Sequence, residues 1–432
     1  MYPNLYYVFK DFFGVKIGFL RFVNSFGFFV AIAFLVGAAL LAKELKRKSQ
    51  EGLLKPTESK VTVGKAATTS ELVTNFILGF LLGFKILALF ILGSEVTQDP
   101  QAYIFSRHGS LPLGLLTGAL FAWMKWRERH KQQLKNPEER VVRIWPHDRV
   151  GEITILALVV GLLGAKLFDI FENWSDFLKA PADFIFSGGG LTFYGGLICA
   201  AIAIVIYCTK NQIGVRHMAD AIAPALMIAY AIGRIGCHVA GDGDWGVYNS
   251  AFKVDSANHI AQAAPNEFTD SVAVHADYFV RHYPNLDSVP HRHFDKPGIL
   301  GFLPNSFFAY HYPHNVNKVG LPIAGCDDIY CNQLPIPVIP TSPYETIICT
   351  VFFLVLWYFR TRLGIAGMLF AFYLVLNGLE RFFIEKIRVN NRMDLFGLHP
   401  SQAEVIALAL VLAGLVLAGI LWQKDRAKVQ SV

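Results

Sequence analysis

The chain has 432 residues, of which 53% are hydrophobic and 17% are charged. A soluble globular chain carries about 25% charged residues, so this composition does not fit a cytosolic enzyme, a disordered chain or a nucleic-acid-binding protein. The net charge of +6 would indicate an acidic partner only if the positive residues gathered on one surface.

Nine segments are long and apolar enough to cross a bilayer core about 30 Å thick, which takes roughly 20 residues of helix. The first of them could be mistaken for a signal peptide. It lacks a basic region before it and a small-residue cleavage site after it, so we interpret it as a retained span. The sequence therefore predicts an all-α polytopic membrane protein. The nine segments are 23–42, 72–94, 111–126, 151–171, 190–208, 218–240, 344–360, 364–385 and 402–422.

The basic residues predict the orientation of these spans. Residues 43–65 carry seven Lys or Arg and residues 125–149 carry eight, whereas the alternating loops 95–110 and 172–189 carry one each. Cytoplasmic loops are enriched in Lys and Arg. We therefore expect the N-terminus outside and the C-terminus inside. The positive charge then marks topology, and we expect no nucleic-acid partner.

The long loop 241–343 lies outside in this topology, and its length is sufficient for a small irregular extracytoplasmic subdomain. Cys326 and Cys331 lie in this loop. An oxidising exterior allows them to form a small disulfide, but two free thiols remain an equal alternative at this spacing. The expected organisation is 1–149 with the N-terminal spans and basic loops, 150–246 with core spans, 247–343 as the loop subdomain and 344–432 with the last core spans.

Ionisable residues within the predicted spans are informative, because each is costly in a membrane. Lys85 alone is best explained by a structural ion pair or by snorkelling. Residues at i and i+4 share a helix face, so Arg381 and Glu385 are predicted to pair within one helix. Except for Lys85, these groups map to the outer leaflet, where two converging arginines are suited to phosphate recognition. The groups are Lys85; Lys166 and Asp169; Arg234, His238, Asp242 and Asp244; and Glu380, Arg381 and Glu385.

Two glycine-rich stretches lie at the same predicted depth. SGGGLTFYGGL at 187–197 is a poor helix sequence, so we expect irregular backbone there that lines a cavity. GRIGCHVAGDGDWG at 233–246 contains a run that begins like a calcium loop. The glycine and glutamate that such a loop requires do not follow, and we expect no metal.

These stretches, in this order, resemble motifs of the prolipoprotein diacylglyceryl transferase family. The second resembles the family signature, which ends in Trp-Gly, and the first resembles its HGGL-type loop. The resemblance covers the first span and about 150–425. Further matching motifs are the lead-in helix DAIAPALMIAYAIG at 220–233, PTSPYE at 340–345, RFFIEKIR at 381–388 and the Ser-Gln pair at 401–402.

The chain departs from the family pattern at several positions. Tyr194 stands where the family has His, and Cys237, followed by His238, stands where it has Asn. One extra residue precedes Trp245, and Lys166 replaces a frequent Arg. The second and third spans and the long loop are additions to a seven-span core.

The resemblance implies that the chain transfers the diacylglyceryl group of phosphatidylglycerol to the lipobox cysteine of a prolipoprotein in the bacterial inner membrane, near the outer leaflet and without a cofactor. Tyr194 is a poor base because tyrosine has a pKa near 10, so we hypothesise that His238 takes the acid–base role. The expected catalytic residues are Arg234, Arg381, Glu385, His238 and Tyr194. The expected substrate-binding residues are Lys166, Gly195, Gly196, Asp220, Gly246, Tyr344 and Glu345.

Two alternatives remain at this point: a polytopic transporter, and a paralogue with changed lipid-transfer chemistry. Transporter sites usually lie near the bilayer midplane, often between repeats, and this sequence shows no repeat. An intramembrane protease is disfavoured because no Gly-x-Ser-x-Gly or His-Glu-x-x-His motif is present.

Overall fold

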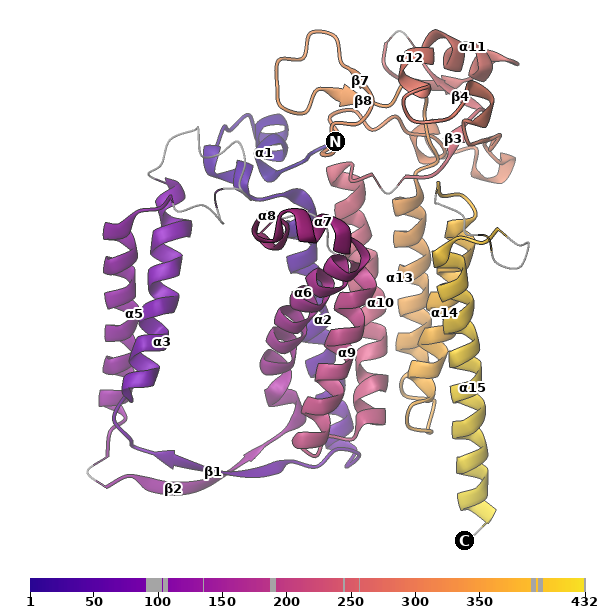
Figure 1. The fold of residues 1–432 in the computed structure, drawn as a ribbon. Helices are drawn as coiled ribbons and strands as arrows, with labels where there is room; N and C mark the ends of the chain where they lie inside the picture. Colours follow the sequence, from indigo (N-terminus) through magenta and orange to yellow (C-terminus); the bar gives the residue numbers. More distant parts are fainter. Residues whose placement is uncertain are drawn as a thin grey trace. The chain divides into compact units, whose positions relative to one another are not determined.

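The computed structural model shows a mostly helical chain (Figure 1). It describes residues 1–90, 103, 108–134, 136–186, 192–243, 245–255, 257–389, 394 and 399–430. Within that part of the chain, six helices are long and apolar enough to cross a membrane, and Tyr194–Lys210 forms a shorter apolar helix. The predicted all-α polytopic membrane protein is confirmed.

A helix overlaps each of the nine predicted segments. The end of the second segment, residues 91–94, lies outside the described residues. The helices are α2 (Ser25–Gln50), α3 (Thr69–Leu81), α5 (Leu111–Lys131), α6 (Val150–Glu172), α9 (Phe193–Lys210), α10 (Val215–Ala240), α13 (Thr341–Phe359), α14 (Met368–Glu385) and α15 (Gln402–Gln430).

The chain divides into two compact units. The first comprises Met1–Val15, Val23–Leu41 and Arg216–Val432, and the second comprises Lys16–Phe22 and Ala42–Val215.

In the second unit, α3 and α5 pack closely because glycines line their contact. A Cβ placed on Gly79 would lie 2.5 Å from the carbonyl oxygen of Thr117, and one on Gly83 would lie 2.4 Å from that of Leu113. The Thr117 hydroxyl also donates to the Gly79 carbonyl at 2.7 Å. Small residues and such hydrogen bonds are what hold helices together in lipid. An antiparallel ribbon of β1 (Thr57–Val63) and β2 (Glu138–Ile144) belongs to the same unit.

Lys85 lies in a short π-helical turn, Leu82–Ile86, that follows α3. Its ammonium group donates to the backbone carbonyls of Tyr103 at 3.0 Å and His108 at 2.8 Å. The lysine therefore satisfies backbone acceptors where regular helix has ended. These contacts with backbone carbonyls fit the structural role that the sequence suggested for Lys85.

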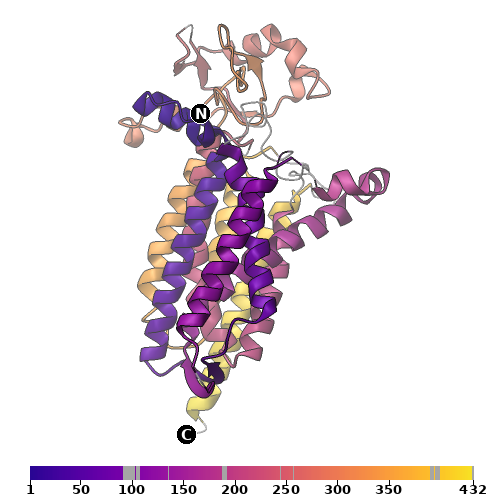
Figure 2. The ribbon, with the colours of Figure 1, turned by 90° about the vertical axis from the view of Figure 1, so that its left-hand side faces the viewer.

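In the first unit, the helices α10, α13 and α14 share a buried apolar core. Part of it is formed by Met227, Cys349, Leu356 and Leu369. Helices α14 and α15 approach closely, since a Cβ on Gly378 would lie 2.6 Å from the carbonyl oxygen of Ala407. The long loop lies at one end of these helices, and the end of α15 lies at the other (Figures 1 and 2).

The loop between α10 and α13 folds into a small subdomain with its own core, which includes Phe279, Val289, Tyr312, Leu334 and Val338. Its regular structure is short, as expected for an irregular subdomain. It contains α11 (Glu267–Val274), α12 (Ala276–Phe279) and three strand pairs: β3 (Tyr248–Asn249) parallel to β6 (His291–Arg292), and the antiparallel pairs β4 (Phe252–Val254) with β5 (Ile260–Gln262) and β7 (Leu321–Pro322) with β8 (Asn332–Gln333).

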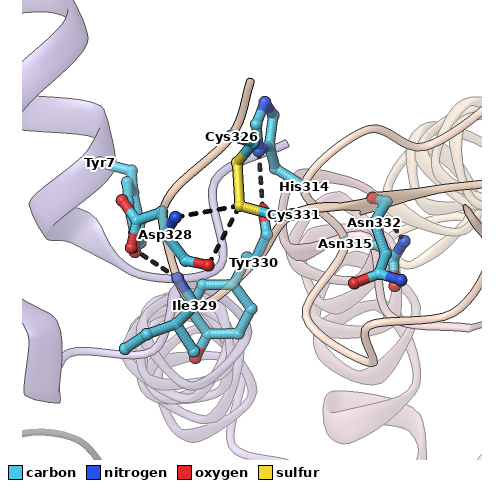
Figure 3. Close-up of a disulfide and its surroundings, with 9 residues drawn as sticks. All are labelled: Tyr7, His314, Asn315, Cys326, Asp328, Ile329, Tyr330, Cys331 and Asn332. Atoms are coloured by element: carbon cyan, nitrogen blue, oxygen red, sulfur yellow. Dashed lines mark hydrogen bonds between the residues drawn. A yellow bond between two sulfur atoms is a disulfide. The ribbon is translucent and has the colours of Figure 1, made fainter. Parts of the chain in front are cut away.

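Cys326 and Cys331 form a disulfide, which decides the question that the sequence left open (Figure 3). Their Cα atoms are 5.6 Å apart, within the usual range for a disulfide. The closed loop presents Asp328, whose carboxylate accepts a hydrogen bond from the Tyr7 hydroxyl at 2.6 Å. Because Tyr7 lies on α1 (Leu5–Phe13), the loop holds this N-terminal helix against the subdomain.

Candidate active site

A buried ion pair between Arg234 and Glu345 forms the centre of the candidate site. Arg234 lies near the end of α10 and Glu345 lies in the second turn of α13. Their side chains are 11% and 0% exposed. The Tyr230 hydroxyl donates to the same carboxylate oxygen, Oε2, at 2.7 Å. Thr346 also joins the helices, because its hydroxyl donates to the Ala231 carbonyl at 3.3 Å.

Arg388 approaches the other oxygen of Glu345, with 3.7 Å between Nη1 and Oε1. A backbone crossing at Gly246 places this arginine, because Gly246 and Arg388 form an isolated β-bridge. The Gly246 amide donates to the Ile339 carbonyl at 2.8 Å. A Cβ at Gly246 would lie 2.5 Å from the Ile387 carbonyl oxygen, so the crossing requires glycine. The structure shows this close packing for Gly246, and its role in substrate binding stays a prediction.

The ion pair predicted between Arg381 and Glu385 on α14 is present, with 3.2 Å between Nη2 and Oε2. The other oxygen of Glu385 accepts a hydrogen bond from the Ser401 hydroxyl at 2.6 Å. Ser401 also caps α15, since its hydroxyl accepts from the Glu404 amide at 3.1 Å. Glu385 is therefore oriented from two sides, and it orients Arg381 in turn.

Glu380 adds a third carboxylate to this end of α14. It is 2% exposed, and neither of its oxygens has a hydrogen-bond partner among the described residues. The end of the bundle thus combines three arginines with three largely buried glutamates. Ionised groups in such a place are tolerated only when they are paired. The pairs of Glu345 with Arg234 and Arg388, and of Glu385 with Arg381, are therefore essential to the cluster.

His238 lies one turn after Arg234, next to aromatic residues of the subdomain. Its Nδ1 is 3.5 Å from the Tyr312 hydroxyl, and its ring centroid is 5.7 Å from that of Tyr310. Burial raises the pKa of the Tyr312 hydroxyl well above its usual value near 10, so this hydroxyl keeps its proton at neutral pH. Tyr312 can therefore orient the imidazole ring.

The family model described as prolipoprotein diacylglyceryl transferase matches residues 109–420. The chain belongs to this family. The transferases of Leptospira interrogans, Dehalococcoides mccartyi and Streptococcus uberis are among its relatives, with 34% identity over 117 residues, 28% over 151 and 26% over 272. These alignments cover 22%, 34% and 62% of this chain and 37%, 54% and 77% of the relatives. The chain thus spans about a third to a half of the length of the first two.

Asp220 does not join the cluster, although the family resemblance placed it among the substrate-binding residues. It lies 14 residues before Arg234 on α10, which is about 21 Å along a helix. Its carboxylate accepts hydrogen bonds from the amides of Gly367 at 2.7 Å and Phe370 at 3.0 Å. Asp220 therefore caps the N-terminus of α14 from a neighbouring helix.

We expect Asp220→Ala to destabilise the protein by about 1–3 kcal/mol, because one buried amide and one partly buried amide lose their acceptor. The fraction of the Asp220→Ala variant that is folded should keep the kcat of the wild type, since the cap lies far from the arginines. Thermal unfolding in detergent and transfer kinetics at low temperature measure the two effects separately. If the variant has a lower kcat but the stability of the wild type, Asp220 belongs to the functional site.

Tyr344 also has a structural partner. Its hydroxyl donates to the Phe307 carbonyl at 2.8 Å, and the two rings are 5.2 Å apart. The contact joins the start of α13 to the subdomain.

The other predicted site residues belong to the second unit. Lys166 pairs with Asp169 at 3.1 Å, and its ammonium group lies 4.7 Å from the ring centroid of Phe184. Tyr194 is the second residue of α9 and is partly buried. Residues 187–191 of the glycine-rich stretch and Asp244 lie outside the described residues.

The expectation of irregular backbone is wrong for Gly195 and Gly196, which lie inside α9. A Cβ on Gly195 would lie 2.7 Å from the carbonyl oxygen of Gly164, and one on Gly196 would lie 2.8 Å from that of Gly161. Glycines on both α6 and α9 thus let the two helices touch. This packing compensates for the poor helix propensity of glycine.

Sequence reasoning missed three residues of the cluster: Tyr230, Arg388 and Ser401. All three stood in motifs that the family resemblance had already marked, since Tyr230 lies in DAIAPALMIAYAIG, Arg388 ends RFFIEKIR and Ser401 opens the Ser-Gln pair. Tyr230 lies four residues before Arg234, on the same helix face. That spacing was a usable signal.

Proposed function

We propose that the protein transfers the diacylglyceryl group of phosphatidylglycerol to the lipobox cysteine thiol of a prolipoprotein. The reaction forms a thioether and releases glycerol phosphate. The observation that carries this proposal is the buried cluster of Arg234, Arg381 and Arg388 in a chain of this family. Family membership also favours this activity over the transporter and the altered paralogue.

The chemistry demands positive charge where the leaving group departs. The thiol sulfur attacks a glycerol carbon, the bond from that carbon to the phosphate oxygen breaks, and the phosphate takes the electron pair. A guanidinium binds phosphate oxygens through two parallel N–H groups. Donors held in place in a water-poor site stabilise such developing charge most strongly. Glu345 and Glu385 hold Arg234 and Arg381 in position for this task.

The thiol must also lose its proton, because a cysteine thiol has an unperturbed pKa near 8.5. We assign the proton to His238, which lies one helical turn from Arg234 and is oriented by Tyr312. The proton then passes to the departing phosphate.

His238→Ala is expected to lower kcat by about 10²- to 10⁴-fold at neutral pH, the usual contribution of a general base. Activity should recover partly above pH 8.5, where the thiol ionises without help. The measurement is a pH–rate profile of the variant beside His282→Ala, a control in the exposed part of the loop. If His238→Ala transfers at nearly the wild-type rate at pH 7, His238 is not the base.

We place the cluster near the outer leaflet of the bacterial inner membrane. At the opposite end of the first unit, arginines lie over aromatic rings, with Arg360 3.7 Å from the centroid of Trp357 and Arg426 3.8 Å from that of Trp422. Aromatic residues with flanking Lys and Arg are typical of the cytoplasmic membrane interface. This supports an outer position for the cluster and the loop subdomain.

The direct test is a transfer assay with the purified protein, phosphatidylglycerol labelled in its acyl chains and a lipobox peptide. We expect thioether-linked peptide and glycerol phosphate in equal amounts. A wild-type protein that makes no thioether overturns the proposal. Solute flux in proteoliposomes under the same conditions would then support the transporter.

A further inference from the structure

A cavity of about 290 Å³ lies between the loop subdomain, the C-terminal end of α14 and the N-terminal end of α15. Its volume is near the lower limit for small-ligand sites, so it suits a small molecule. The polar wall is formed mainly by His291, Arg292, Glu385, Lys386, Arg388 and Glu404. Two of these, Glu385 and Arg388, also belong to the buried cluster, so the cavity adjoins the site described above.

The charges in this wall favour an anion. Both carboxylates are already engaged, because Glu404 pairs with Lys386 at 2.6 Å and Glu385 pairs with Arg381. Arg292 makes no hydrogen bond or ion pair through its side chain with any residue that the structure describes. A guanidinium that has no counter-charge among the described residues therefore lines a cavity that Arg388 also lines.

One stretch of backbone pairs with both arginines that line the cavity. Its first residue, Gly246, bridges to Arg388, and its last residue, Asn249, pairs with Arg292 in the parallel β3–β6 ladder. The Ser250 amide donates to the Arg292 carbonyl at 3.0 Å. The neighbouring His291 packs its ring 4.2 Å from that of Phe268. Arg292 is thus placed by the folded subdomain.

We infer that this cavity binds the phosphate group of glycerol phosphate, the released product, between Arg388 and Arg292. The inference rests on the proposed function. A phosphomonoester carries about −1.5 to −2 charges at pH 7, more than the diester of the lipid, so a second guanidinium favours the product. The added subdomain then supplies a product subsite through Arg292.

Binding is tested with the full chain in phosphatidylcholine nanodiscs, titrated calorimetrically with glycerol phosphate and, separately, with inorganic phosphate. We expect Arg292→Ala to weaken glycerol phosphate binding about tenfold or more, as for loss of a charge-assisted pair. Arg292→Lys should weaken it less. Arg281→Ala, which removes an exposed cation elsewhere in the same loop, should bind as the wild type does. Equal affinity in Arg292→Ala and the wild type overturns the inference.

Kinetics distinguish the product from the lipid headgroup as the source of the phosphate. If the site receives the product, Arg292→Ala raises the inhibition constant of glycerol phosphate about tenfold more than it raises the KM for phosphatidylglycerol. A larger rise in KM than in the inhibition constant overturns the product assignment.

The two proposals fail in different ways. If the wild type makes the thioether but its binding of glycerol phosphate does not depend on Arg292, only the cavity assignment is overturned. If the wild type makes no thioether but binds glycerol phosphate through Arg292, the transferase and the product assignment are overturned, and the cavity stays a phosphate-binding site.

Discussion

Glu345→Ala is expected to destabilise the protein by about 3–5 kcal/mol and to abolish transfer. The side chain is 0% exposed and is the carboxylate that Arg234 and Arg388 share. Removing it leaves two cations close together without their counter-charge, and unpaired buried charge is among the most costly defects in a protein. Unfolding of the purified protein in detergent and the transfer assay measure the two effects.

A second substitution separates charge from shape. Glu345→Gln keeps the volume and an acceptor for the Tyr230 hydroxyl, so we expect a smaller loss of stability with the same loss of transfer. Glu128→Ala removes an exposed glutamate of α5 and should change neither. The assignment is contradicted if Glu345→Ala unfolds at the wild-type midpoint.

Arg234→Lys and Arg381→Lys should each lower kcat about 10²- to 10³-fold, the usual effect of removing one fixed donor from a developing negative charge. Lysine keeps the positive charge but cannot bind phosphate through two parallel N–H groups. If the arginines act chiefly in the transition state, kcat and kcat/KM fall together. Steady-state kinetics with phosphatidylglycerol as the varied substrate test this.

Arg362→Lys is the matched control, because this arginine lies 3.6 Å from the ring centroid of Tyr358 at the opposite end of the unit. It should retain full activity. The unfolding midpoints of Arg234→Lys and Arg381→Lys should stay near that of the wild type, since an ammonium can still pair with Glu345 or Glu385. Full activity in either variant removes that arginine from phosphate binding.

The helices could be predicted from the sequence because membrane spans are specified locally. An apolar run of sufficient length is nearly a complete description of a span, and i,i+4 spacing is enough to predict the Arg381–Glu385 pair. Glycine required different reasoning. Its low helix propensity in water predicted irregular backbone at Gly195 and Gly196, whereas contact with α6 keeps both of them helical.

The contacts that complete the site could not be derived in the same way. Glu345 meets Arg388, 43 residues later, only because the backbone crosses at Gly246. Asp220 caps a helix that begins nearly 150 residues after it. Such pairs depend on how the elements pack, and no local pattern in one sequence encodes them.

The stretch from Gly246 to Asn249, which ends in β3, has a consequence for how this chain tolerates change in length. Four residues, 246–249, fix the separation of two cations, one from the helical bundle and one from the subdomain. Insertions elsewhere in the subdomain lengthen exposed turns at modest entropic cost. An insertion within these four residues would shift the register of both pairings at once. We therefore expect insertions to be rare within residues 246–249 and more frequent in the turns that follow them.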